Sequence, residues 1–492
     1  MYDTIPNHVL QKYCVPFSTM QTQKVHSTTK KQSRPERKIS TYKPNIWKYD
    51  HLLTLTSEYS EEKYKVEVEK LKEELSCTYF SNSTISPVDL LELIDSIDKL
   101  GLSCYFEVET KEALGKIIMS VKTNSSSTEE DLYATALCFR LLREHGYHAP
   151  QDVLKDFFDG KGKLKVSDVK TLLELLEGSY LSMEGENLLD DTRLFITKKL
   201  KSLVSKSDYT FTNKEYLSNS LSCPFAWRVK WYAVRRHISA QELECNNANP
   251  MLLKLAKLNF NIIQATHQQD LKHVLRWWRN VSIVEDLSFT RDRIVESFFC
   301  AVGVSSEPQH GSMRIWLTKV IELVLIIDDV YDIYGSLAQV QQFTRAIETW
   351  DPNEVEGLPE CMQICFRSLH DTIEEISVEI QQQKGGLSAL PYLKQVAELE
   401  RGDVASSILC YMQQENVLED VAREHIESII LDSWKKINYH FNTLSTSQQK
   451  LVKHVINEAR MAHVMYQFGD GFGVQDGETR DQVLFNLVHP IT

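Results

Sequence analysis

The spacing of apolar residues constrains the fold most, because it repeats with the period of an α-helix from about residue 50 to the end of the chain. Leu90, Leu93, Ile94 and Ile97 follow the i, i+3, i+4, i+7 pattern of one helical face. The strict alternation of apolar and polar residues that marks a half-buried strand is nearly absent. The sequence therefore predicts an all-α protein. No apolar run approaches the roughly eighteen residues of a membrane-spanning helix.

Residues that break helices divide this pattern and indicate where domains meet. The length of 492 residues suits two or three domains. The segment 246–250 is the best boundary, since Asn249 can cap a helix whose first residue is Pro250. We therefore predict one helical domain over 37–245 and a second over 246–492.

Charge is distributed unevenly along the chain. The net charge of −13 argues against a nucleic-acid surface, which needs clustered Lys and Arg. Residues 1–48, however, carry nine Lys/Arg against two Asp/Glu, and 1–36 are rich in Ser and Thr. Residues 1–36 are thus predicted to be a disordered tail, either an organellar transit peptide or a plain basic extension. The ten cysteines show neither a disulfide framework nor a zinc spacing, which favours a reducing compartment.

The most informative segment is an apolar run followed by three aspartates. Residues 320–327 are apolar on nearly all faces, which predicts a helix buried in a bundle and ended by Gly335. Asp328, Asp329 and Asp332 follow, and the spacing of four places Asp328 and Asp332 on one face. Crowded carboxylates at the negative end of a helix dipole repel one another. A divalent cation would remove this penalty, and Mg²⁺ suits because it bridges carboxylates to substrate phosphates. Solvated acids at an exposed helix end are the alternative.

Two arginines upstream form a candidate anion clamp. Arg291 and Arg293 are predicted to open a helix capped by Ser288 or Thr290. Guanidinium groups at a helix N-terminus suit a diphosphate. Salt bridges at the protein surface are the alternative interpretation.

Taken together, these motifs resemble those of plant class I terpene synthases, from residue 37 to the end. The sequences of several segments most resemble those of angiosperm monoterpene synthases. The motifs that carry the resemblance are the aspartate-rich motif Asp328, Asp329 and Asp332, the RxR pair Arg291 and Arg293, the RWW element Arg276, Trp277 and Trp278, the tandem-arginine motif Arg37, Lys38 and Trp47 with Lys in place of the second Arg, and the closing segment 461–476 with Asp470.

The resemblance implies an N-terminal, barrel-like helical domain without catalytic residues, and a C-terminal class I helical bundle. It implies Mg²⁺, or Mn²⁺ as the alternative ion, bound by Asp328, Asp329 and Asp332. The diphosphate would be bound by Arg291 and Arg293 and, through the metal, by Asp328 and Asp332. The expected substrate is geranyl diphosphate and the product a monoterpene, acyclic or simply cyclised, such as ocimene. Members of the family are usually monomers. The basic tail suggests the plastid as the location, with the cytoplasm as the alternative. The resemblance implies no membrane and no nucleic-acid partner.

The chain departs from the family in its second metal motif, of the form (N/D)DxxTxxxE. Glu398 matches the final Glu, but the Asp and Ser/Thr ligands before it are absent. In the family several helices separate a PYLK-like stretch from the ERGD turn, whereas here 391–394 and 400–403 are almost adjacent. We interpret this as an internal deletion between Val396 and Ala397, which leaves the C-terminal bundle incomplete and should expose apolar faces of its neighbours.

Two functional readings follow. The first is a magnesium-dependent synthase acting on geranyl diphosphate, impaired by the deletion. The alternative is a catalytically inactive pseudogene or splice product that keeps a helical scaffold. A chain-elongating prenyltransferase would need a second DDxxD motif, which is missing.

Overall fold

The computed structural model describes residues 43–492 with several gaps. The gaps are 82–84, 122–128, 160–163, 167, 205–216, 219, 244–248, 282–289, 332–335, 385–406, 468, 474 and 476, and side chains are also left out at 119–121, 129–131 and 383–384. Several predicted features lie outside the described residues: the tail 1–36, Arg37, Lys38, Asp332, Gly335, Glu398 and the junction of Val396 with Ala397.

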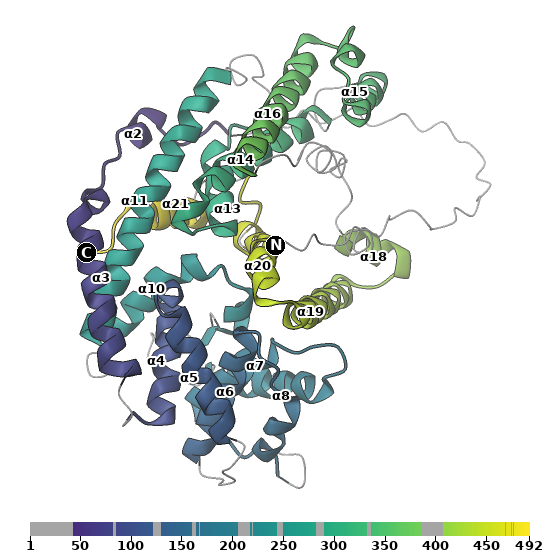
Figure 1. Cartoon of the computed structure of the whole chain (residues 1–492). Helices are drawn as coiled ribbons and strands as arrows, with labels where there is room; N and C mark the ends of the chain where they lie inside the picture. Colours follow the sequence, from purple (N-terminus) through teal and green to yellow (C-terminus); the bar gives the residue numbers. More distant parts are fainter. Residues whose placement is uncertain are drawn as a thin grey trace. The chain divides into compact units, whose positions relative to one another are not determined.

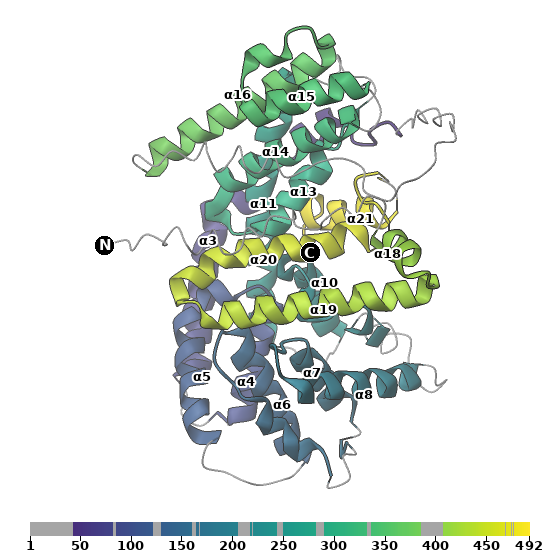
Figure 2. The same cartoon turned by 90° about the vertical axis from the view of Figure 1, so that its right-hand side faces the viewer.

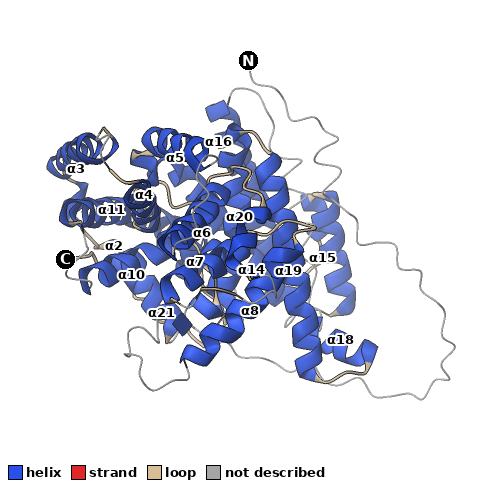
Figure 3. Ribbon diagram, turned by 90° about the horizontal axis from the view of Figure 1, so that it is seen from below, coloured by secondary structure: helices blue, strands red, loops and turns tan. Residues whose placement is uncertain are grey.

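Within the described ranges the secondary structure is helical, and the prediction of an all-α protein is confirmed. Figure 3 shows blue helices joined by tan loops, and the described residues form only two isolated β-bridges, Phe158 with Leu164 and Gln467 with Gly469. Among the described helices, none has the length and apolar character needed to cross a membrane.

The helices follow one another along the chain as labelled in Figure 1. The first part contains α2 (Tyr49–Leu53), η1 (Glu58–Ser60), α3 (Glu62–Leu75), η2 (Ser76–Phe80), α4 (Pro87–Lys99), η3 (Ser103–Tyr105), α5 (Glu107–Val121), α6 (Glu129–Glu144), η4 (Gln151–Phe157), α7 (Val169–Ser179), α8 (Asn187–Val204), η5 (Phe225–Trp227) and α10 (Lys230–Leu243). The second part contains α11 (Pro250–Val281), α13 (Ile294–Val304), η6 (Pro308–His310), α14 (Gly311–Asp329), α15 (Leu337–Thr349), η8 (Pro352–Val355), α16 (Glu360–Lys384), α18 (Ser407–Glu415), α19 (Glu419–Thr443), α20 (Thr446–Tyr466), α21 (Glu478–Val483) and η9 (Leu484–Val488).

The long helix α11 begins where its capping residues predict. Asn249 Oδ1 accepts hydrogen bonds from the backbone N–H groups of Met251 (3.1 Å) and Leu252 (3.2 Å), and Pro250 is the first helical residue. Satisfying two of the otherwise unpaired N–H groups with one side chain is what an asparagine cap contributes.

Two large apolar cores and a smaller cluster around Trp227 and Trp434 hold the described helices together. One lies within α4–α8 and includes Ile94, Phe139 and Leu176. The other surrounds α11 and draws residues from α3, α10, α13, α14 and α16. Contacts group Thr41–Thr492 into a single unit. The division of the chain at 245/246 stays a prediction.

Helix α20 lies directly against α13 because of a glycine. A Cβ atom added to Gly303 would lie 2.0 Å from Met461 Sδ and 3.1 Å from Tyr232 Cε2. Met461 is itself buried. The absence of a side chain at Gly303 therefore sets the distance between α13 and α20.

Helices α18 and α19, which follow the undescribed segment 385–406, are poorly buried. Helix α18 buries none of its residues, and the 25-residue α19 buries only Ala422 and Trp434. Leu418, at the N-cap of α19, is 78% exposed, and Val421 and Ile429, which lie on one side of the helix, are 46% and 47% exposed. Figure 2 shows α19 running beside α20, with α18 at its end. That missing helices uncover this face stays a prediction.

Candidate active site

The two described aspartates of the DDxxD motif meet Arg291 at the end of α14. The Arg291 guanidinium lies 2.7 Å from Asp328 Oδ2 and 2.9 Å from Asp329 Oδ1, and the Arg291 backbone N–H donates to Asp329 Oδ2 at 2.7 Å. The structure thus brings together three residues that the sequence analysis selected from two separate motifs. The positive guanidinium offsets the repulsion between neighbouring carboxylates.

These two aspartates have different surroundings. Asp329 is fully buried, and both of its oxygens contact Arg291. The Asp328 side chain is 42% exposed and meets Arg291 through Oδ2. Asp328 is therefore the described carboxylate that can turn toward a ligand, whereas Asp329 fixes the position of Arg291.

The segment 291–293 precedes the helix that it was expected to open, and this prediction was wrong. Helix α13 begins at Ile294, with Arg293 at the capping position and no side-chain cap of its own. The backbone N–H groups of Arg291 and Arg293 donate to Asp329 and Glu322 of α14 instead. These bonds to buried carboxylates hold the segment along α14 in a non-helical conformation.

Glu322 is a buried acid of α14 that the sequence analysis missed. Its Oε1 accepts from the Arg293 backbone N–H at 2.9 Å, and its Oε2 accepts from Ser297 Oγ at 2.7 Å. Burial raises the pKa of Glu322 to about 8. A glutamate within an otherwise apolar helical run was the signal that could have revealed it, since a buried acid requires partners.

A second buried acid connects α13 with the N-terminal segment and with the segment that follows α20. Glu296 Oε1 accepts from Trp47 Nε1 at 2.6 Å and from Gln475 Nε2 at 3.0 Å, and burial raises the pKa of Glu296 to about 7. Gln475 Oε1 in turn accepts from the Ile46 backbone N–H at 3.1 Å. The Trp of the tandem-arginine motif thus lies beside the RxR segment. Nothing in residue spacing predicted this contact.

Asp292, between the two arginines, anchors the segment to two aromatic residues. Its Oδ1 accepts from Tyr49 Oη at 2.5 Å and from Trp278 Nε1 at 3.1 Å. Burial and the neighbouring Asp292 carboxylate raise the pKa of Tyr49 far above its usual range, so its hydroxyl remains a donor. Trp278 belongs to the RWW element, which gives that motif a structural partner.

The structure places the Arg293 guanidinium among backbone carbonyls. Its Nε donates to Phe472 O at 2.6 Å, its Nη1 to Asp292 O at 2.9 Å and its Nη2 to Lys43 O at 3.0 Å. Arg293 is fully buried, and its described contacts join the closing segment after α20 to the N-terminal segment. Of the two predicted clamp arginines, Arg291 is the one that contacts the aspartates.

Four aromatic side chains of the C-terminal half have varied surroundings. Phe298 and Phe472 are buried. Tyr331 Oη lies 2.9 Å from Thr344 Oγ1, and Trp316 Nε1 donates to Glu379 Oε2 at 2.5 Å. Cys300 is partly buried.

Family models cover both parts of the chain. The model for the terpene synthase N-terminal domain matches residues 46–221, and the model for the terpene synthase metal binding domain matches 279–399 and 394–436. The chain belongs to the terpene synthase family. The two matched stretches of the metal binding domain meet at 394–399, the position where the sequence analysis predicts a deletion.

Curated relatives support this membership. An alpha-farnesene synthase of Ricinus communis is 41% identical, with 92% of this chain and 96% of the relative aligned. A chloroplastic myrcene synthase of Quercus ilex is 33% identical, with 92% and 91% aligned. The first alignment extends over 546 residues, more than the 492 of this chain. The relative therefore contains residues that have no counterpart here.

Solved structures of terpene synthases share the fold. A limonene synthase with 2-fluorolinalyl diphosphate superposes with a TM-score of 0.85 at 31% identity, covering 93% of this chain and 100% of the other. Grey poplar isoprene synthase, in complex with three Mg²⁺ ions and dimethylallyl-S-thiolodiphosphate, superposes with a TM-score of 0.78 at 31% identity, covering 91% and 99%. The two-domain, all-α architecture of terpene synthases, lyases that act on prenyl diphosphates, is the fold of this chain.

Proposed function

We propose that this terpene synthase chain binds Mg²⁺ and the diphosphate of a prenyl substrate at the end of α14, and that its turnover is impaired. The convergence of Arg291 with Asp328 and Asp329 carries the proposal. A guanidinium within hydrogen-bond distance of acidic metal ligands lets one diphosphate contact both a cation and a metal.

The residues present fit Mg²⁺ as far as they are described. Asp328 offers an accessible carboxylate, and Asp332 is the second ligand that we propose. Bound Mg²⁺ would act as a Lewis acid that stabilises negative charge on the departing diphosphate. Asp329 would keep Arg291 directed at the same diphosphate. Arg293 is proposed to assist, although its described hydrogen bonds go to backbone carbonyls.

Geranyl diphosphate is the proposed substrate and a monoterpene the proposed product, because several sequence segments are similar to those of monoterpene synthases. Farnesyl diphosphate is the second candidate. It is favoured by the 41% identity to a protein named alpha-farnesene synthase, against 33% to the myrcene synthase.

The impairment follows from the second metal motif. Glu398 is the single ligand of that motif that the sequence retains, and the family model is interrupted at 394–399. Each metal contributes several kcal/mol of charge stabilisation in the general case. Enzymes typically turn over at about 1–1,000 s⁻¹. We therefore propose that this chain ionises its substrate far more slowly than that. A fully inactive splice or pseudogene product is the limiting case.

Three further assignments complete the proposal. The chain is proposed to consist of a helical domain over 37–245 and a metal-binding domain over 246–492. It is proposed to act in the plastid, as the basic, Ser/Thr-rich tail and the chloroplastic name of the myrcene synthase suggest. It is also proposed to be a monomer at low concentration.

Calorimetric binding of inorganic pyrophosphate, with and without Mg²⁺, tests the site separately from turnover. We expect Mg²⁺-dependent binding by the purified chain and its loss in Asp328→Asn. Unchanged binding in Asp328→Asn, or no binding to the folded wild-type chain, would contradict the proposed site.

Product analysis with geranyl and farnesyl diphosphate then tests the reaction. We expect a trace of ten-carbon hydrocarbon that depends on Mg²⁺ and is lost in Asp328→Asn. Turnover near 1 s⁻¹ would refute the impairment. A product from farnesyl diphosphate alone would replace the geranyl assignment with the second candidate.

A further inference from the structure

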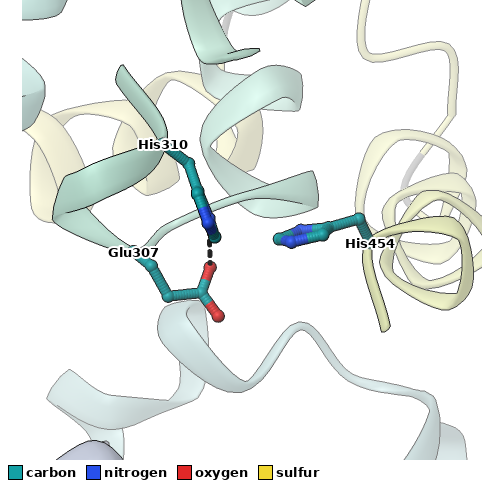
Figure 4. A group of neighbouring side chains, drawn as sticks. All are labelled: Glu307, His310 and His454. Atoms are coloured by element: carbon teal, nitrogen blue, oxygen red, sulfur yellow. Dashed lines mark ion pairs between the residues drawn. The ribbon is translucent and has the colours of Figure 1, made fainter. Parts of the chain in front are cut away.

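Three side chains that the proposed reaction does not use gather between η6 and α20. Glu307 precedes η6, His310 ends it, and His454 lies in α20. One potential ligand atom from each lies within 4.8 Å of the other two. Figure 4 shows the carboxylate and the two imidazole rings directed toward a common space.

Glu307 presents one oxygen to this space. Its Oε1 accepts from Lys453 Nζ at 2.9 Å. Its Oε2 is buried, has no hydrogen-bond partner among the described residues, and lies 3.7 Å from His310 Nδ1. Because the attraction of the Lys453 ammonium outweighs the effect of burial, the pKa of Glu307 falls to about 2. An anionic oxygen without a donor is thus directed at two imidazoles.

The connector that carries Glu307 is rigidly held. Arg314 is fully buried and donates to the backbone carbonyls of Ser305 (2.9 Å) and Glu307 (2.6 Å). Its guanidinium also pairs with Asp270 Oδ2 at 2.7 Å. The position of the Glu307 backbone is therefore set independently of any ligand.

Both imidazoles are oriented by neighbours. His454 Nδ1 lies 3.2 Å from the Val304 carbonyl, to which it can donate, and this leaves the lone pair of Nε2 available. His310 Nδ1 lies 3.1 Å from Ser305 Oγ. Burial lowers the pKa of His310, which keeps this ring neutral near pH 7. A backbone carbonyl that fixes the tautomer is a usual outer-shell partner of a metal-binding histidine.

We propose that Glu307, His310 and His454 form a binding site for a first-row transition-metal ion, chiefly Zn²⁺. Two imidazoles and one carboxylate are a frequent zinc donor set that leaves a position for water, whereas Mg²⁺ prefers oxygen ligands throughout. The site is separate from the aspartates at the far end of α14. Bound metal would join α20 to the connector between α13 and α14, and so would stabilise the fold.

Lys453 sets the affinity of this site. Its ammonium occupies Oε1 of Glu307 and repels a dication placed near Oε2. Lys453→Met should therefore strengthen binding by roughly tenfold, since removing a positive charge a few ångströms from the ion relieves repulsion of this order. A purely structural role for the three residues predicts no such gain.

The test uses the full chain, freed of affinity tags and treated with chelator, and titrated with Zn²⁺ and with Co²⁺. We expect one tight Zn²⁺ equivalent, a visible absorption band of tetrahedral Co²⁺, and a rise in Tm with Zn²⁺. The double variant His310→Ala/His454→Ala should weaken binding by more than about tenfold and abolish the band. Lys453→Met should show the opposite change.

Two controls separate this site from other metal-binding groups. His51→Ala removes an exposed histidine elsewhere, and Asp328→Asn alters the proposed magnesium site; neither should change the Co²⁺ band. Absence of the band in the folded wild-type chain would overturn the proposal. Equal Zn²⁺ affinity of the wild type and the double histidine variant would overturn it too.

Discussion

At the scale of single residues, two neighbouring aspartates have separable tasks. Asp329 is buried with both oxygens against Arg291, while Asp328 is partly exposed. Asp329→Asn should lower the free energy of unfolding by about 3 kcal/mol, because it leaves the buried Arg291 guanidinium incompletely paired. Asp328→Asn should change it by less than about 1 kcal/mol. Urea denaturation of both variants beside the wild type measures the difference.

The comparison also distinguishes two views of the motif. Equal destabilisation by the two substitutions would show that the aspartates share one structural role. A large effect of Asp328→Asn alone would reverse the assignment of tasks.

Buried glutamates should make the chain less stable as the pH rises. Burial raises the pKa of Glu322 in the folded chain to about 8, from 4.5 for an ordinary glutamate. Between these values the folded state binds more protons, so this contribution is complete below pH 4.5 and is lost as the pH rises through about 8. Burial lowers the pKa of His237 and His267 from 6.5 to about 3. These two residues make the chain more stable as the pH rises, but only between about pH 3 and 6.5.

The clearest window is therefore pH 6.5 to 8, in which Glu322 alone accounts for roughly 2 kcal/mol. Glu296, with a pKa of about 7, adds to the same decline. Thermal unfolding of the wild type should show a falling Tm across this window. Glu322→Gln, which stays neutral, should reduce the slope; an unchanged slope would mean that Glu322 is ionised in the folded chain throughout.

The sequence predicted which residues matter at this scale better than it predicted their contacts. The DDxxD and RxR spacings identified Asp328, Asp329 and Arg291, which do meet. Most partners of Arg291, Asp292 and Arg293 could not be inferred from the motifs, because they lie 14 to 250 positions away along the chain. Only the tertiary fold brings such groups together.

At the scale of helices, apolar period and capping residues located most elements. Pro87–Lys99 and Pro250–Val281 form where the spacing and the Asn249 cap predict. The start of α13 was misplaced because two buried carboxylates of α14 take the N–H groups of the preceding segment. Propensity rules read local sequence and do not include such distant acceptors.

The contact between α13 and α20 yields a prediction for Gly303. Gly303→Ala should destabilise the fold by about 1–3 kcal/mol, since the new methyl group overlaps the buried Met461 side chain. Denaturation curves measure the loss. Combining it with Met461→Ala should recover part of the stability that the two single changes lose, as coupled neighbours do. If the losses of stability in the two single variants simply add in the double variant, residues 303 and 461 are not coupled.

At the scale of the whole molecule, the exposed apolar face of α19 is the feature that most favours self-association. Leu418, Val421 and Ile429 face solvent, while the C-terminal half of α19 is anchored by Trp434, which stacks on Trp227 at 5.4 Å. An apolar face of this kind favours association. We expect the chain to be a monomer at low concentration and to self-associate as its concentration rises.

Leu418→Glu/Ile429→Glu should restore the monomer and change the free energy of unfolding by no more than about 0.5 kcal/mol per site. Light scattering after size exclusion measures the mass. Val66→Glu, at a comparably exposed apolar position of α3, is the matched control and should leave the association unchanged. A wild-type chain that remains monomeric at high concentration would contradict the expectation.

Sequencing the transcript across the codons for Val396 and Ala397 decides whether the gene encodes a complete synthase or only this shortened chain. An insert that encodes further helices and an (N/D)DxxT segment ending at Glu398 would mean that the gene also encodes a complete synthase. Direct joining of the two codons would mean that the shortened chain is its product.

The solvent-facing side of α19 should also make this chain a substrate of protein quality control. Chaperones and proteases act on polypeptides that display apolar surface, and the abundance of such a polypeptide in the cell depends on its removal as much as on its synthesis. If both transcripts exist, the choice between them would regulate enzyme dosage. Each shortened message would then consume a transcript and a round of translation while adding little lasting catalyst.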